Sequence, residues 1–249
     1  MTANAPLKLE QNPADELLRG LGRRRLDAMV AAANEVYECY RVLGKANANV
    51  VGELLRGQGT FYEWDHYPKG DIYDDETHGQ HYYHAHRGEH GEHGHFHTFL
   101  RAKGMPPNLK PLPLEREVEW PKGDDAIAHL VAISMDKFGY PTHLFTTNRW
   151  VTGETWYRAD DVIAMLPRFA IDHAYPSWPT NRWVTAMIAL FRPQIEFLVR
   201  RRDEEVARRQ ASAGEDDLLE DRDFEVASMM EINVDSQADA IEAALKALA

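Results

Sequence analysis

Apolar residues recur at helical spacing along the first part of the chain. Between Leu26 and Leu43 they fall three or four positions apart, which places them in one stripe on an α-helix. Gly44 is expected to end this helix, and a short second helix is expected to end at Gly57. The pattern therefore predicts an N-terminal helical segment over residues 1–57.

From residue 58 onward the helical stripe gives way to aromatic and β-favouring residues, interrupted by turn formers such as Pro68, Gly70 and Gly79. This pattern predicts a histidine-rich antiparallel core over residues 58–158, with a central sheet of about five strands in an open or barrel-like form. The expected strands are Phe61–His66, Gln80–His86, His95–Arg101, Ile127–Asp136 and Thr142–Thr147.

Helical spacing returns over residues 159–249, which we expect to form a C-terminal helical segment. A short helix is predicted over Ala159–Phe169. A long helix is predicted from Asn181 to near Arg209, capped by Thr180 and kinked at Pro193. An acidic linker over 212–223 and a last helix capped by Ser236 follow. Together the three segments predict one compact domain of the α+β class.

A hexapeptide occurs twice, as Thr147–Thr152 and as Thr180–Thr185. The flanking residues do not match, so the repeat does not indicate a domain duplication. We expect its Thr-Asn pair to serve as a turn or a helix cap in both places.

Composition narrows the classes of partner. The net charge of −12 argues against nucleic acid or an anionic membrane surface as the main partner. The single cysteine, Cys39, lies in an apolar helical stretch, and neither a signal pattern nor a membrane-length apolar run is evident. We expect a cytoplasmic protein with a small-molecule substrate and, through its C-terminal helices, a surface for a protein partner.

The histidines carry the strongest chemical signal. Nine of the twelve lie between His66 and His97, and they include the pairs His84-Ala85-His86 and His95-Phe96-His97. Residues two apart on a strand share a face, so each pair points one way.

If residues 87–94 form the loop of a hairpin, His86 is expected opposite His95 and His84 opposite His97, with Tyr82 opposite Phe99. Cross-strand neighbours lie about 5 Å apart, so four imidazoles would gather on one face. The reverse face would carry mostly apolar side chains, namely Tyr83, Ala85, Phe96, Thr98 and Leu100.

Gathered imidazoles are the usual protein ligands of Zn, Fe and Cu, and a carboxylate extends the choice to Mn. We therefore predict a divalent transition metal (Fe, Zn, Mn or Cu) at this face. The candidate ligands are His84, His86, His95, His97 and, from a later strand, His143. Glu92 and Tyr82 are the candidate catalytic residues: Glu92 is the favoured acid/base or carboxylate ligand, and Tyr82 is expected to line the site. His129 is a further candidate for a ligand or for a group that supports one.

Part of this region resembles the two cupin motifs. The residues that carry the likeness are His84-Ala85-His86 with Glu89 or Glu92, and Gly139–His143 with Asn148. The resemblance implies a β-barrel whose metal is held by His84, His86, one of the two glutamates and His143. Oxygenase, isomerase or related chemistry would follow.

Two alternatives remain open at this stage. The run from His93 to Phe99 is similar to the histidine-triad pattern of nucleotide hydrolases and transferases, which implies a metal-free reaction with His95 as nucleophile. The other alternative is metal storage, sensing or an accessory role without catalysis.

Overall fold

A computed structural model describes residues 9–86, 91–113, 119–213 and 217–248. Within them the chain forms one sheet of seven strands in the order β1-β7-β6-β5-β4-β3-β2. Neighbours are antiparallel except the parallel pair β1 and β7. The strands are β1 (Leu9–Glu10), β2 (Tyr67–Tyr73), β3 (Gly79–His84), β4 (Gly94–Arg101), β5 (Ile127–Met135), β6 (Pro141–Thr147) and β7 (Val226–Glu231).

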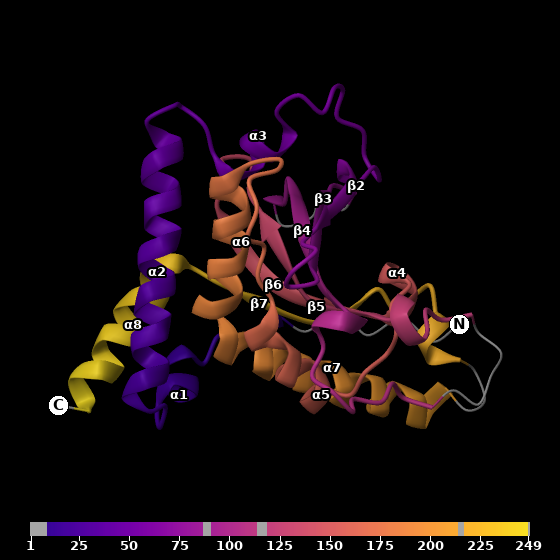
Figure 1. Ribbon diagram of the computed structural model, residues 1–249. Helices are drawn as coiled ribbons and strands as arrows, with labels where there is room; N and C mark the ends of the chain where they lie inside the picture. Colours follow the sequence, from indigo (N-terminus) through magenta and orange to yellow (C-terminus); the bar gives the residue numbers. More distant parts are fainter. Residues whose placement is uncertain (1–8, 87–90, 114–118, 214–216, 249) are drawn as a thin grey trace.

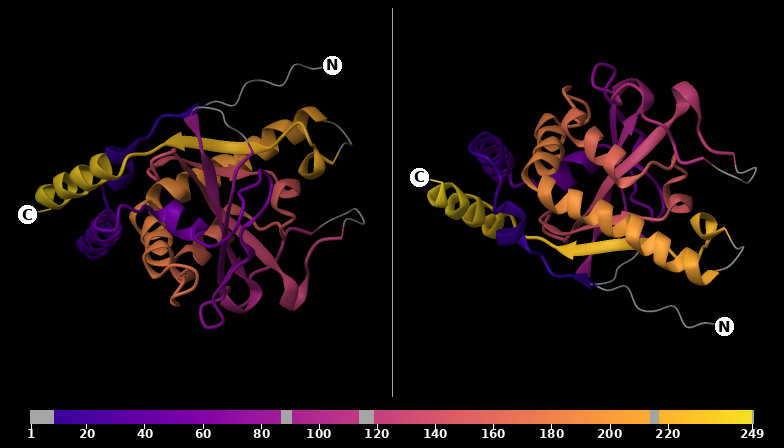
Figure 2. Two further views of the ribbon diagram at one scale, coloured as in Figure 1. Left: turned by 90° about the horizontal axis from the view of Figure 1, so that it is seen from above. Right: turned by 90° about the horizontal axis from the view of Figure 1, so that it is seen from below.

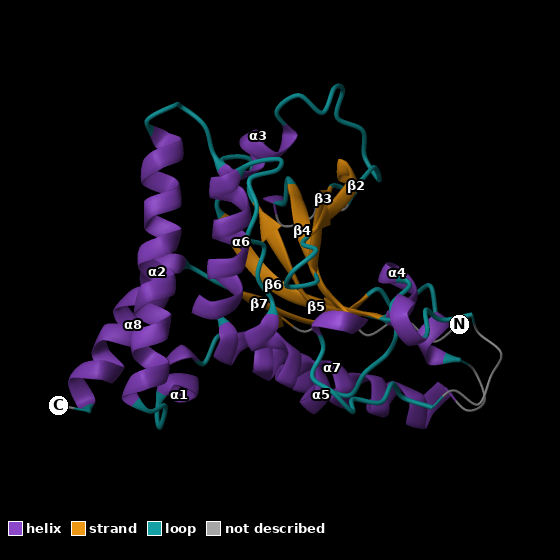
Figure 3. Ribbon diagram, in the orientation of Figure 1, coloured by secondary structure: helices purple, strands orange, loops and turns teal. Residues whose placement is uncertain are grey.

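The helices lie almost entirely to one side of this sheet (Figures 1 and 3). They are α1 (Ala14–Leu18), α2 (Arg23–Gly44), α3 (Val50–Leu55), α4 (Arg149–Thr152), α5 (Ala159–Met165), α6 (Trp178–Leu190), α7 (Arg192–Ala213) and α8 (Val234–Ala247). None of the helices in the described ranges is both long enough and apolar enough to cross a bilayer.

Two helical layers cover the sheet. α6 and α7 form the inner layer, α2 packs on the outer side of α6, and α8 packs on α2 (Figures 1 and 2). The main core lies between the sheet and the inner layer. It includes Tyr83 from β3, Phe96 and Leu100 from β4, and Trp183 from α6. The prediction that these strand residues face the core is confirmed, and it follows that the histidines occupy the opposite face.

The sheet differs from the predicted one in size and closure. Seven strands replace the expected five, and because β1 and β2 are its two edges it does not close into the barrel that the cupin resemblance implies. Phe61–His66 is not a strand, since Trp64 takes a left-handed backbone conformation with φ of 72°. β2 follows it instead, despite Pro68 and Gly70, and its pairing with β3 is irregular between Tyr67 and Ile72.

The helix ends also correct the sequence-based expectations. Ser177, not Thr180, caps α6 by accepting from the Thr180 backbone N–H, and Asn233, not Ser236, caps α8 in the same way. Pro193 has a stronger effect than a kink, because α6 ends at Leu190 and α7 starts at Arg192. The expected linker over 212–223 holds the end of α7 and the buried pair Leu218 and Leu219, while 214–216 lie outside the described residues.

The repeated hexapeptide adopts two different structures. In the first copy Thr147 ends β6 and Asn148 caps the short helix α4, as predicted. In the second copy Thr180 and Asn181 already lie inside α6, so the cap prediction is wrong there. Both asparagines are fully buried. The tertiary contacts around each copy therefore decide its local structure.

Candidate metal centre

The hairpin of β3 and β4 forms in a register displaced from the predicted one. His84 lies opposite His95, Tyr82 opposite His97 and Gln80 opposite Phe99. The predicted pairing of His86 with His95 was wrong by two residues. β3 ends at His84, and beyond it the Ala85 carbonyl accepts a hydrogen bond from the Trp64 backbone N–H at 3.0 Å. An even displacement keeps every side chain on its face. The histidines therefore still share one face of the sheet.

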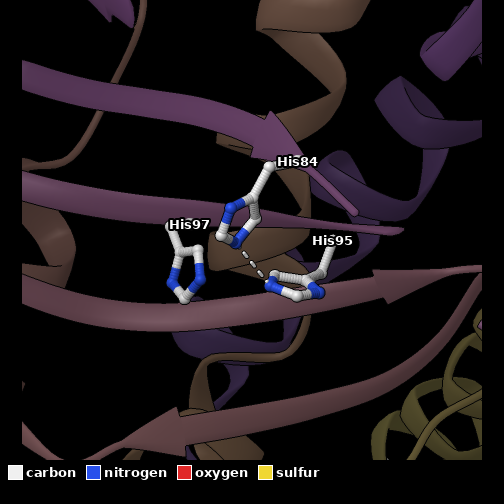
Figure 4. Close-up of side chains that lie close together, drawn as sticks. All are labelled: His84, His95 and His97. Carbon is white, nitrogen blue, oxygen red and sulfur yellow. Dashed lines mark hydrogen bonds between the residues drawn. The ribbon is translucent and has the colours of Figure 1, made fainter. Parts of the chain in front are cut away.

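Three of these histidines converge (Figure 4). His84, His95 and His97 each offer a ring nitrogen, and the three nitrogens lie within 4.8 Å of one another. Nε2 of His84 and Nε2 of His95 are 2.7 Å apart. All three residues are at most 7% exposed. Nitrogens bound to one ion at about 2.05 Å lie roughly 3 Å apart, so small ring rotations convert this cluster into a coordination sphere.

Each of the two β4 histidines has a hydrogen-bond partner behind it. Nδ1 of His95 lies 2.7 Å from Oε1 of Glu92, and since a carboxylate only accepts, His95 carries its proton on Nδ1. Nδ1 of His97 lies 3.0 Å from Nε2 of His129. Both rings thus have Nδ1 engaged, so Nε2 is the atom that each could offer to an ion. Metal-binding histidines are held in this way.

Two of these rings, those of His84 and His129, are kept neutral by their surroundings. Burial and the neighbouring His95, His86 and His66 lower the pKa of His84 to about 2, and burial lowers the pKa of His129 to about 3. With His95 Nε2 unprotonated, the short contact to His84 requires a proton on His84 Nε2. A cation between the two nitrogens would take that proton's place.

The other predicted site residues lie around this group of three. His86 follows the end of β3, and its ring centroid is 4.8 Å from that of His84 and 5.0 Å from that of His95. Tyr82 is buried on the same face, and its ring lies beside those of both His84 and His97. Glu92 contacts His95 as described above. Glu89 and the rest of 87–90 lie outside the described residues.

His143 is not brought into the group. His143 lies on β6 and is paired with Ser134 of β5, which is itself paired with His95 of β4. His143 and His95 therefore share a face of the sheet, but strand β5 separates them.

The sequence-based expectations did not include Ser134. The hydroxyl of Ser134 is buried and has no hydrogen-bond partner among the described residues. Its position beside His95 depends on the pairing of β4 with β5, which the sequence alone did not indicate.

A buried acid behind the centre was also missed. Glu154 is 1% exposed, and its Oε2 accepts from the backbone N–H of His129 at 2.7 Å. Burial raises its pKa to about 7, although Arg202 favours the charged form. Arg202 is itself buried and lies 4.2 Å from the ring of Trp156. A lone glutamate in a loop carries no sequence signal for such a place.

The comparisons with known proteins place this centre in a family without assigning it an activity. No curated protein and no solved structure matches the chain. One family model matches residues 30–232, a span that includes strands β2 to β7 and every residue of the centre. Because this is well over half of its length, the chain belongs to the family described as Domain of unknown function (DUF6969).

Proposed function

We propose that this protein is a metal-dependent enzyme that holds one divalent transition-metal ion through His84, His95 and His97. The observation that carries the proposal is the convergence of three buried imidazole nitrogens within 4.8 Å. Two of the rings, those of His95 and His97, are also held in orientation by contacts of their Nδ1 atoms with Glu92 and His129. Three protein ligands leave coordination positions open for water or substrate, as in catalytic metal sites.

The donor set favours some ions over others. Three imidazole nitrogens suit zinc, iron and copper, whereas manganese prefers sites rich in oxygen ligands. Glu92 contacts the ring of His95 rather than the group of nitrogens, so within the described residues the donors are nitrogens. Zinc, iron or copper is therefore the expected ion.

Burial favours catalysis over storage. A storage or delivery site must release its ion, and exposed, loosely held ligands serve that purpose. Here the ligands lie on β3 and β4, two adjacent interior strands of a seven-stranded sheet, and His97 is fully buried. A rigid site with open positions is what Lewis-acid or redox catalysis requires.

The metal-free alternative with His95 as nucleophile fits this geometry less well. A nucleophilic imidazole needs an available nitrogen lone pair. Nδ1 of His95 faces Glu92 at 2.7 Å, and Nε2 faces His84 at the same distance. Attack on a phosphate through Nε2 would require the contact with His84 to break.

Elemental analysis of the untagged protein tests the proposal. The wild-type chain is expected to carry close to one equivalent of zinc, iron or copper after dialysis, and the His95→Ala/His97→Ala double variant is expected to carry almost none. His173→Ala serves as the matched control, since His173 contacts the Tyr73 carbonyl rather than the triad. Circular dichroism of all three proteins checks that each is folded.

The same measurement separates the ligand sets. His143→Ala is expected to retain the ion, because His143 lies outside the group of three. Loss of the ion from His143→Ala would instead support the set implied by the cupin resemblance. Equal metal content in wild type and double variant would refute the proposal.

A further inference from the structure

The charge of the centre limits what its open positions can accept. Three neutral imidazoles leave the charge of a divalent ion uncompensated, and the hydrogen-bonded carboxylate of Glu92 offsets only part of it. The centre is buried, where an uncompensated charge is costly. An anionic oxygen ligand at an open position removes this cost, whereas a neutral ligand does not.

A cavity of about 650 Å³ reaches His66, whose ring contacts the ring of His84, although none of the three proposed ligands lines the cavity. It is lined by Gln58, Thr60, Tyr62, Asp65, His66, Tyr67, Lys69, Gly70 and Asp71. This volume is within the range of small-molecule sites. The wall is rich in hydrogen-bonding side chains, which suits a small polar compound better than an apolar one. It carries two carboxylates, Asp65 and Asp71, against one cation, Lys69, so the preference for an anion must come from the ion and not from the wall.

His66 connects this cavity with the triad. Its ring stacks on Tyr82 with a centroid distance of 3.6 Å and meets the ring of His84 edge-on at 5.6 Å. The side chain is nevertheless 44% exposed. His66 therefore has one side against the centre and another toward the cavity.

The position of His66 is fixed by a chain of hydrogen bonds. Its Nδ1 lies 3.0 Å from Oδ1 of Asp71, whose Oδ2 accepts from Gln80 Nε2 at 2.7 Å. Oε1 of Gln80 in turn accepts from Arg101 Nε at 2.7 Å. Asp71 holds a left-handed backbone conformation, with φ of 61°. Such strain is maintained only where surrounding contacts support it, often at functional sites.

Resting on the proposed function, we propose that the substrates are small carboxylates: a carboxylate oxygen completes the metal's coordination sphere, and the compound enters through this cavity past His66. The charge of the centre selects the anion. The cavity wall receives the polar remainder of the molecule, and the fixed ring of His66 is the inner limit of the entry path.

Cobalt(II)-loaded protein and two matched probes test this proposal. Acetate and acetamide have nearly the same shape, and only acetate carries the charge. We expect acetate to change the visible absorption of the bound cobalt, with acetamide at least about tenfold weaker. Equal effects of the two probes, or no effect of acetate, would overturn the inference.

Rapid-mixing measurements test the entry path. In His66→Ala the association rate of acetate is expected to rise several-fold while the cobalt content stays that of wild type; His173→Ala is expected to leave the rate unchanged. An unaltered rate in His66→Ala overturns the path, and loss of cobalt from that variant shows that His66 is a ligand instead. If the wild-type chain does not bind cobalt, the proposed function itself is refuted. If the chain binds cobalt but the bound cobalt does not respond to acetate, only the assignment of carboxylate substrates is refuted.

Discussion

The contact between Glu92 and His95 offers the sharpest test of how the centre is built. The two side chains are 5% and 1% exposed, and they meet at 2.7 Å. In Glu92→Gln the amide oxygen can still accept from Nδ1 of His95, so the shape and the hydrogen bond persist while the charge is removed. What is lost is the support that a carboxylate gives to a ligand imidazole.

Loss of such support typically weakens metal affinity 10- to 100-fold, which corresponds to about 1.4–2.8 kcal/mol. Competition against a chromogenic chelator measures the dissociation constant directly. We expect Glu92→Gln to fall in this range, and Glu38→Gln, a surface change at the ion pair with Arg41, to match wild type.

Thermal unfolding of the metal-free proteins accompanies the titration, so that a folding defect is not mistaken for a binding defect. If Glu92→Gln binds the ion as tightly as wild type, the carboxylate does not support His95 and our account of the centre is wrong. An equal loss in Glu38→Gln would point to long-range electrostatics instead.

Three further predictions concern stability. Folding raises the pKa of Glu154 from 4.5 to about 7, so between these pH values the folded state binds more protons than the unfolded state. As the pH rises from 4 to 8, the free energy of unfolding of wild type should therefore fall by roughly 3 kcal/mol relative to that of Glu154→Gln. Urea unfolding at several pH values measures this difference, and parallel curves for the two proteins would contradict it. In Gly94→Ala the new Cβ would lie 2.5 Å from the Tyr83 hydroxyl, which should cost about 1–3 kcal/mol, whereas Gly44→Ala meets nothing within 4 Å and should cost almost nothing. Finally, chelation of the ion should lower the melting temperature of wild type by about 5–10 °C and leave that of the double histidine variant unchanged, since only a protein that binds the ion is stabilised by it.

Alternation in the sequence was sufficient to place the histidines on one face and Tyr83, Phe96 and Leu100 on the other. It was not sufficient for the register, because the register depends on where β3 ends. That end is set by residues outside the hairpin, such as Trp64, whose backbone bonds to Ala85. Local patterns thus identify faces, while tertiary contacts decide which residues are neighbours.

Other parts of the fold were missed for similar reasons. β7 is a short apolar run between two helices, and a run of that length has no distinctive period. For His129 the sequence leaves open whether it binds an ion or supports a residue that does, and for Glu154 and Ser134 it carries no signal. Their places near the centre come from pairing and packing between segments far apart in the chain, which spacing along the sequence cannot show.

The nearness of the three ligands in the chain has a consequence for folding. His84 and His95 are eleven positions apart, and His97 follows two residues later. Closing so short a loop is fast and loses little entropy, so this hairpin can form while the rest of the chain is still disordered. The proposed ion would then be captured at the start of folding and act as a nucleus, around which the helical layers pack.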